Sequence, residues 1–317
     1  MAPYRIVFMG SPRFALPTLE WLLENEEVAG VVTQPDRRQG RGRELSPPPV
    51  KVAAQRAGIP VLQPVRLRAP EAVAQVAAFR PELIVVVAYG QILPQEVLDI
   101  PPLGCLNVHA SLLPKYRGAA PVQWALIRGE TVTGVTIMRM EAGLDTGDIL
   151  LQRATAIGPE ETAEELSGRL AVMGAGLLAE ALARLRENTL FAVPQNHAAA
   201  TLAPRLTKAD GAIDWRRTAR EVCNLVRGVQ PWPGAYTFLR GRPLKVFGCR
   251  VVEGEATVPG EVLEVGPEGL LVSAGEGRLI LRELQAAGGK RLAAAQFVLG
   301  HPVPPGTVLG TTGLKPD

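Results

Sequence analysis

One stretch constrains the fold more than any other. Residues Leu83–Ala88 read Leu-Ile-Val-Val-Val-Ala, apolar throughout and mostly β-branched. A strand that is apolar on both faces must be covered on both faces, which is typical of the centre of a parallel sheet. Similar short runs predict strands at Arg5–Met9, Val28–Thr33, Ile59–Leu62, Leu106–His109, Gly134–Met140 and Ile149–Ala156.

Segments with helical spacing of apolar residues alternate with these strands. They lie at Phe14–Leu23, Val50–Ala57, Ala69–Phe79 and Glu160–Leu185. Strand–helix alternation predicts an α/β domain with an open, mostly parallel, Rossmann-like sheet. Ligands of such sheets bind at the carboxyl ends of the strands.

The last third of the chain has a different pattern. The alternation dissolves around residues 189–206, which we interpret as a linker. One predicted helix, Thr218–Val226, then precedes short runs separated by Gly and Pro at 8–12-residue spacing, a pattern typical of a small barrel. We therefore expect a first domain at residues 1–188 and a smaller, OB-like β-barrel domain at residues 207–317.

Composition narrows the class of protein. Of 317 residues, 47% are hydrophobic and 21% charged, which is typical of a soluble globular protein. The longest uncharged apolar run, Leu83 to Gln95, is shorter than the roughly 18–20 residues that span a bilayer. The three cysteines are far apart, as expected in a reducing compartment. We expect a cytoplasmic protein without a membrane partner, and nothing in the sequence demands a dimer.

Several kinds of site are disfavoured. The first strand ends in Gly10-Ser11-Pro12-Arg13-Phe14, which lacks the glycines that a pyrophosphate needs, and no Gly-Lys-Ser/Thr loop follows any strand. The three histidines and three cysteines show no paired ligand spacing, so we expect no metal site.

Basic residues are concentrated in one loop. The net charge is only +3, but Asp36–Lys51 holds Arg37, Arg38, Arg41, Arg43 and Lys51 against two acidic residues. The loop covers residues 34–49, whereas a βα loop usually has roughly 2–6 residues. A polyanionic partner and a merely solvated loop both remain open from this pattern alone.

Polar side chains gather after two predicted strands. Asn107 and His109 are two residues apart at a strand end, so both point to the same face. Asp145 lies in the turn Gly143–Asp148, and near His109 it would orient the ring. Asn107 could then donate to an oxyanion. Each residue alone could equally be structural, as a cap, a buried histidine or a turn former.

The same stretch offers no convincing nucleophile. Ser111 opens a loop, and Cys105 lies back within the strand. Direct attack by an amine substrate therefore fits better than a covalent enzyme intermediate.

The stretch Asn107–Pro121, followed by Thr133–Met138 and Gly143–Asp148, resembles the folate-dependent formyltransferases. The resemblance implies their fold, 10-formyltetrahydrofolate as formyl donor, no metal, and a catalytic trio of Asn107, His109 and Asp145. It also implies a folate pocket bordered by Ala88, Tyr89, Gly90, Ile92, Ser111, Leu112, Leu113, Pro114, Gly118 and Asp145.

Loop 34–49 resembles the insertion of those family members that formylate methionyl initiator tRNA. Ile213–Trp215 with Val229–Ala235 resembles their C-terminal domain, although sugar-nucleotide formyltransferases carry a similar one. We expect the loop to be disordered without tRNA and to order on it. The expected tRNA contacts are Arg37, Arg38, Arg41, Arg43, Lys208, Arg216, Arg217 and Lys245. A sugar-nucleotide formyltransferase and a non-catalytic tRNA-binding relative remain the alternatives.

Overall fold

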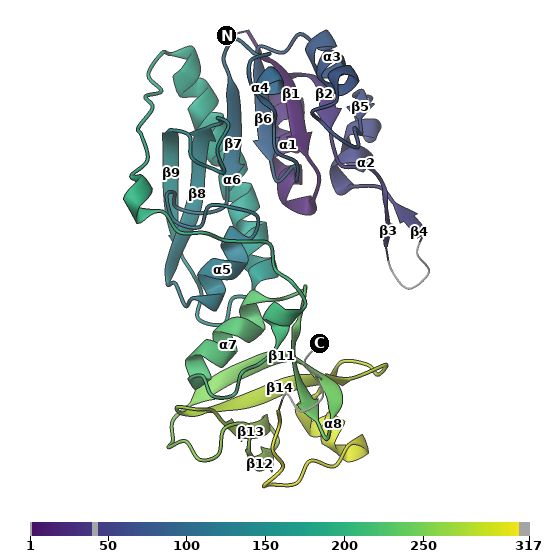
Figure 1. The fold of residues 1–317 in the computed structure, drawn as a ribbon, viewed down its shortest axis with the longest axis vertical. Helices are drawn as coiled ribbons and strands as arrows, with labels where there is room; N and C mark the ends of the chain where they lie inside the picture. Colours follow the sequence, from purple (N-terminus) through teal and green to yellow (C-terminus); the bar gives the residue numbers. More distant parts are fainter. Residues whose placement is uncertain (1, 40–43, 311–317) are drawn as a thin grey trace. The chain divides into compact units, whose positions relative to one another are not determined.

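The computed structural model describes residues 2–39 and 44–310 and divides into two compact units (Figure 1). One unit contains Met1–Pro121, Val132–Thr155 and Ser167–Pro204. The other contains Val122–Thr131, Ala156–Leu166 and Arg205–Asp317. This division differs from the expected boundaries 1–188 and 207–317, because two short segments before residue 188 group with the second unit. Most of the segment 189–206, expected to be a linker, groups with the first.

A seven-stranded sheet forms the centre of the first unit. Its strand order is β5-β2-β1-β6-β7-β8-β9. The strands are β1 (Arg5–Gly10), β2 (Glu27–Val32), β5 (Val61–Leu62), β6 (Leu83–Val87), β7 (Cys105–His109), β8 (Val132–Arg139) and β9 (Ile149–Ala156). Neighbouring pairs from β5 to β7 are parallel, and β8 is antiparallel to β7. The parallel pairs confirm the prediction of an open, mostly parallel α/β sheet. All five residues of β6 are buried, as expected of a strand at the centre of such a sheet.

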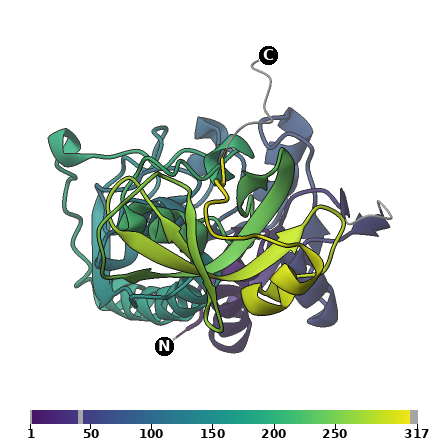
Figure 2. The ribbon, with the colours of Figure 1, turned by 90° about the horizontal axis from the view of Figure 1, so that it is seen from below.

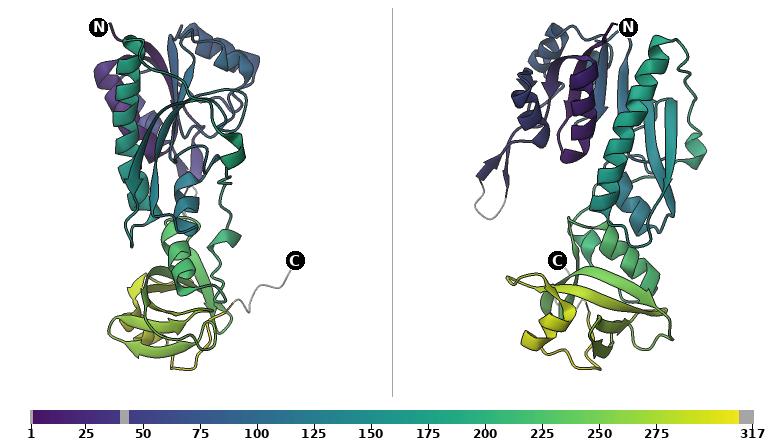
Figure 3. Two further views of the ribbon diagram at one scale, coloured as in Figure 1. Left: turned by 90° about the vertical axis from the view of Figure 1, so that its left-hand side faces the viewer. Right: turned by 180° about the vertical axis from the view of Figure 1, so that it is seen from behind.

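Helices cover both faces of this sheet. Helices α1 (Leu16–Asn25) and α6 (Ala163–Arg186) lie on one face in the view from behind (Figure 3). On the other face, residues of β1 and β6 form one core cluster with Val76 of α3 (Pro70–Ala78) and Val97 of α4 (Gln95–Leu98). Helix α2 (Pro49–Arg56) and short 3-10 turns at Arg13–Ala15 and His197–Ala199 also belong to this unit, whereas α5 (Pro121–Ile127) groups almost entirely with the second. Among the described residues, α6 alone is long and apolar enough to cross a membrane, and half of its most apolar window is buried; one such helix is weak evidence for a membrane span.

A substitution at Gly134 in β8 would test how closely β8 and β9 pack at this edge of the sheet. A Cβ there would lie 2.1 Å from the Arg153 carbonyl oxygen in β9. We expect Gly134→Ala to lower the free energy of unfolding by about 1–3 kcal/mol, as overpacking does. The control is the same substitution at Gly168, an exposed position in α6 with nothing within 4 Å of its Cβ direction. Gly168→Ala should raise stability by roughly 0.5–1 kcal/mol in urea unfolding; equal effects of both variants would contradict the packing.

The second unit is built on an antiparallel sheet of order β10-β11-β14-β13-β12. Its strands are β10 (Ala235–Leu239), β11 (Arg242–Val252), β12 (Val262–Gly266), β13 (Gly269–Ser273), β14 (Arg278–Ala286) and β15 (Leu292–Ala293). Helix α7 (Ala219–Gly228) begins with a capping box between Thr218 and Glu221. Helix α8 (Ala294–Gly300) packs against β14 (Figure 2). A short 3-10 turn spans Ala209–Gly211. This antiparallel sheet is consistent with the expected OB-like barrel.

The described part of the basic insertion forms two short paired strands. Strands β3 (Arg37–Gln39) and β4 (Glu44–Ser46) pair antiparallel as the stem of a hairpin (Figure 1). At its base Asp36 binds Lys51 Nζ at 2.7 Å and accepts a hydrogen bond from Gln63 Nε2 at 2.7 Å. The Gln63 amide and the Lys51 cation lower the pKa of Asp36. Strand pairing and this cluster hold the backbone of the stem, which differs from the expectation of a disordered loop. Residues 40–43, on which the rest of that expectation falls, lie outside the described residues.

Candidate active site

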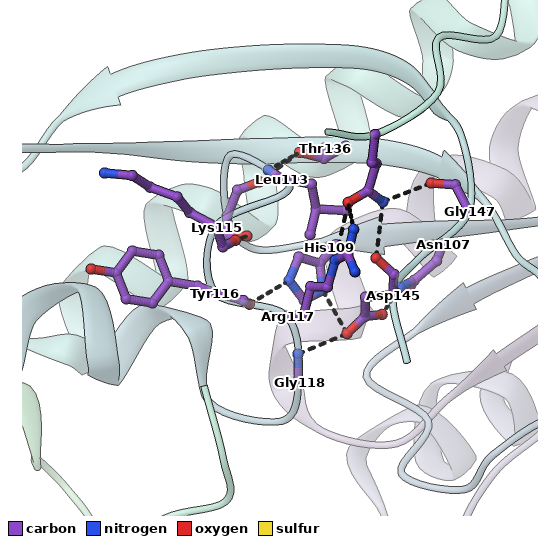
Figure 4. Close-up of polar contacts among 12 residues, drawn as sticks. Asn107, His109, Leu113, Lys115, Tyr116, Arg117, Gly118, Thr136, Asp145 and Gly147 are labelled. Atoms are coloured by element: carbon purple, nitrogen blue, oxygen red, sulfur yellow. Dashed lines mark hydrogen bonds and ion pairs between the residues drawn. The ribbon is translucent and has the colours of Figure 1, made fainter. Parts of the chain in front are cut away.

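The structure brings Asn107, His109 and Asp145 together at the carboxyl end of β7 (Figure 4). Asn107 and His109 share one face of the strand and are 8% and 5% exposed. Asp145 comes from the turn between β8 and β9. Asn107 Nδ2 donates to Asp145 Oδ1 at 3.3 Å, and His109 Nδ1 lies 3.7 Å from Asp145 Oδ2.

The contacts of His109 define where its protons lie. Nε2 is 2.9 Å from the Tyr116 carbonyl oxygen, and a carbonyl can only accept, so Nε2 carries a proton. Nδ1 then faces the Asp145 carboxylate at 3.7 Å, within ion-pair range but longer than a hydrogen bond.

The Asp145 turn is tight and strained. Asp145 has φ +52°, in the left-handed region that non-glycine residues rarely adopt. A Cβ at Gly147 would lie 2.0 Å from the Arg139 carbonyl oxygen, so only glycine fits there. The Gly118 N–H donates to Asp145 Oδ2 at 2.8 Å. Strain of this kind is found where a functional group must point in one direction.

Side-chain hydrogen bonds to its backbone carbonyls hold the loop 111–118 in place. Ser111 Oγ donates to the Lys115 carbonyl at 2.6 Å, and Thr136 Oγ1 donates to the Ser111 carbonyl at 2.6 Å. Gln152 Nε2 donates to the Leu113 carbonyl at 2.8 Å. The backbone of this loop is therefore held in place beside His109.

The residues predicted to border the folate differ in how exposed they are. Ala88, Gly90 and Ile92 are exposed, Ile92 by 84%, and Leu112, Pro114 and Gly118 are half-buried. The Ser111 and Leu113 side chains are buried, so only their backbones can border a ligand. Tyr89 is buried as well. Its ring lies in the apolar core cluster, where burial raises its pKa to about 12, and the residue is 2% exposed, so only its backbone can border a ligand.

Cys105 is unsuited to nucleophilic attack. Burial, with a smaller effect of Asp99, raises the pKa of its thiol to about 12. The reactive form of cysteine is the thiolate, which such a pKa suppresses. This agrees with the absence of a convincing nucleophile in the sequence.

The predicted tRNA contacts have different surroundings. Arg37 is exposed, and its Nη2 donates to Gln34 Oε1 at 3.0 Å. The backbone of Arg38 lies in β3, and Arg41 and Arg43 lie outside the described residues. In the second unit, Lys208 and Lys245 are exposed. Arg216 pairs with Asp214 at 2.8 Å and Arg217 with Glu221 at 3.5 Å. Such exposed pairs are weak and leave both arginines available to a phosphate.

Sequence reasoning missed a group of residues behind the trio. Arg117 is only 7% exposed, and its Nη2 lies 2.6 Å from Gln195 Oε1 and 3.1 Å from His197 Nδ1. Gln195 and His197 come from the segment interpreted as a linker. No periodicity marks them, because that segment is neither helix nor strand around Gln195. Among residues 2–39 and 44–310, no cluster of three or more His, Cys, Asp and Glu could hold a metal ion.

Both parts of the chain match a known protein family. Residues 4–182 match the family described as formyl transferase, and residues 205–302 match the formyl transferase C-terminal domain. The chain therefore belongs to the formyl transferase family.

Curated relatives refine this assignment. The chain is 54% identical to a methionyl-tRNA formyltransferase of Geobacter sulfurreducens over 314 residues, covering 99% of both chains. It is 50% identical to that of Acetivibrio thermocellus over 309 residues, 96% of this chain and 99% of the relative. Within the family, the chain groups with the methionyl-tRNA formyltransferases.

Solved structures share the fold at low identity. An N-formyltransferase of Helicobacter canadensis, in complex with folinic acid and dTDP-3-aminofucose, matches with a TM-score of 0.66 at 19% identity, covering 89% of this chain and 99% of that one. HypX of Aquifex aeolicus, in complex with tetrahydrofolic acid, matches with a TM-score of 0.63 at 19% identity, covering 94% of this chain and 47% of that one.

Proposed function

We propose that this protein transfers the formyl group of 10-formyltetrahydrofolate to the α-amino group of methionyl initiator tRNA, giving formylmethionyl-tRNA for translation initiation. The observation that carries the proposal is the convergence of an amide, an imidazole and a carboxylate at one strand end, with Asp145 within 3.3 Å of Asn107 and 3.7 Å of His109.

The roles of these residues follow from their chemistry. The methionyl amine attacks the formyl carbon, and the carbonyl oxygen becomes an oxyanion. The intermediate then collapses: the C=O re-forms, the bond between the formyl carbon and the folate nitrogen breaks, and tetrahydrofolate leaves as that nitrogen takes up a proton, while the amine gives up one. Asn107 uses one N–H on Asp145 and presents its second to that oxyanion. Protonated His109 adds positive charge, while Asp145 holds the ring and helps to move the amine proton through the imidazole or a bound water molecule.

The folate pocket is proposed at the adjacent strand ends. The backbones of Ala88 and Gly90, both at positive φ, and the exposed Ile92 side chain offer polar and apolar contacts there. The backbone of loop 111–118 borders the trio from the other side. Polar groups converging on a partly apolar surface are typical of small-molecule sites.

The basic hairpin favours tRNA over a sugar nucleotide. A sugar nucleotide does not require an arginine-bearing arm, whereas a charged tRNA presents phosphates next to its amino group. We therefore propose that Arg37, Arg38, Arg41 and Arg43 contact the acceptor end, and that Lys208, Arg216, Arg217 and Lys245 contact tRNA from the second unit.

A direct assay tests this function. With 10-formyltetrahydrofolate as donor, we expect the initial rate of formylation to be much higher for charged initiator tRNA than for charged elongator methionine tRNA or for a UDP-amino-sugar. Formylation of the amino-sugar alone would establish the sugar-nucleotide alternative. Tight tRNA binding without formyl transfer would establish a non-catalytic tRNA-binding protein.

We also propose that the protein acts in the cytoplasm as a monomer and needs no membrane partner. This proposal rests on the role in translation, which takes place there. Light scattering at micromolar concentration checks it, and a mass of twice 33.8 kDa would contradict the monomer.

A further inference from the structure

Gln195 lies in the irregular segment between α6 and the turn at His197–Ala199, yet it is 5% exposed. Its Nε2 donates to the carbonyl oxygens of Asp145 at 2.9 Å and Gly147 at 2.7 Å. Its Oε1 accepts from Arg117 Nε at 3.1 Å and Nη2 at 2.6 Å. Both ends of the buried amide are therefore used.

These four contacts join the two loops that form the site. Asp145 has φ +52°, in the left-handed region, which is unfavourable for a non-glycine residue unless its surroundings hold it. Gln195 bonds the backbone of that turn on either side of Thr146. The same amide holds Arg117, and the next residue, Gly118, donates its N–H to the Asp145 carboxylate at 2.8 Å.

We propose that Gln195 is a positioning residue for formyl transfer, holding the Asp145 carboxylate against His109. This rests on the function proposed above. The amide meets both requirements: its NH₂ group donates to two backbone carbonyls, which can only accept, and its oxygen accepts from a guanidinium, which can only donate. A glutamate would still accept from Arg117 but would turn a carboxylate oxygen toward the two carbonyls.

The segment that carries Gln195 has other anchors. Val193 and Ile149 exchange two backbone hydrogen bonds of 2.8 and 2.9 Å, and the Arg117 N–H donates to the Thr201 carbonyl at 2.9 Å. We therefore expect variants at Gln195 to fold, with the Asp145 turn released.

The test compares Gln195→Glu and Gln195→Met with the parent. We expect kcat for formylation to fall by about 10²-fold, the effect of displacing a catalytic group by roughly 1 Å. The KM values for 10-formyltetrahydrofolate and charged tRNA should stay within about threefold of the parent, because no binding group is removed. The methionine variant carries no charge, so agreement between the two variants separates lost hydrogen bonds from added charge.

Two further measurements link the effect to Asp145. At fixed pH, the ring nitrogen chemical shifts of His109 in both variants should move toward those of Asp145→Asn. Adding Gln195→Glu to Asp145→Asn should lower kcat by less than about threefold more, because residues that act through one another are not additive.

Gln230→Glu is the matched control. Gln230 Nε2 also donates to two backbone carbonyls, those of Val226 at 2.9 Å and Phe247 at 2.7 Å, within the second unit. This variant should lower the melting temperature without moving the His109 shifts.

A fall in kcat of less than threefold, unchanged His109 shifts, or full additivity with Asp145→Asn would each overturn the inference. Unfolding of both Gln195 variants would also count against it, because the residue would then be structural. An inactive parent would instead refute the proposed function, and the His109 shifts would still report on positioning.

Discussion

Replacing Asn107 by alanine is expected to lower kcat for formylation by about 10²–10³-fold, the usual effect of losing one oxyanion donor. The Asn107 amide is 8% exposed and close to Asp145, so its orientation is set before substrate binds. The substitution also removes the 3.3 Å hydrogen bond that helps to hold the Asp145 carboxylate. Single-turnover assays with saturating charged tRNA and formyl donor would measure the chemical step.

The control for this prediction is Asn25→Ala. Asn25 is exposed at the end of α1, and its Nδ2 donates to the Trp21 carbonyl at 2.8 Å. It should leave kcat unchanged. His109→Ala and Asp145→Asn extend the test to the rest of the trio. If any of the three site variants kept kcat within about threefold of the parent, that residue would lose its proposed role.

Neutralising the basic hairpin is expected to have the second-largest effect. Changing Arg37, Arg38, Arg41 and Arg43 to alanine should lower kcat/KM for charged tRNA by about 10²-fold. Each exposed arginine–phosphate contact is taken as worth roughly 0.7 kcal/mol, and each 1.4 kcal/mol is tenfold in affinity. Affinity for the folate should be unaffected, because the hairpin carries none of the proposed folate contacts.

Salt dependence makes this prediction specific. Removing four phosphate contacts to a single strand should reduce the slope of log affinity against log salt by about three, at roughly 0.7 per contact. The matched control is Arg66→Ala with Arg68→Ala, since both arginines are exposed in the same unit and have no assigned role. If the quadruple variant used charged tRNA as well as this control did, the reason for preferring tRNA over a sugar nucleotide would be lost.

Apolar periodicity predicted the central elements closely. The run at Leu83–Ala88 became β6, Leu83–Val87, and the run at Ile149–Ala156 became β9 with the same bounds. The predicted helix at Val50–Ala57 became α2, Pro49–Arg56. All five residues of β6 are buried, so its unbroken apolar pattern and its tertiary environment agree. Strand β9 buries only Leu150, and α2 buries only Val50 and Ala54. For those two segments, the spacing of the apolar residues was enough to predict the element.

Sequence patterns did not predict structure that depends on contacts with residues distant in the chain. The stem of the hairpin depends on Asp36, Lys51 and Gln63, which lie up to 27 residues apart. Tyr89 adjoins exposed Gly90, yet its ring turns into the core. No local period encodes either result.

By itself, the sequence determined the α/β sheet, the antiparallel second unit, the family, and the residue types available at the strand ends, because burial and motif spacing are written along the chain. Only the tertiary structure decided which polar atoms meet: that Asp145 sits 3.7 Å from His109 Nδ1, and that Gln195, 50 residues beyond Asp145, bonds its backbone. The physical reason is that hydrogen bonds need positions accurate to a few tenths of an ångström, and the packing of the whole unit sets those positions.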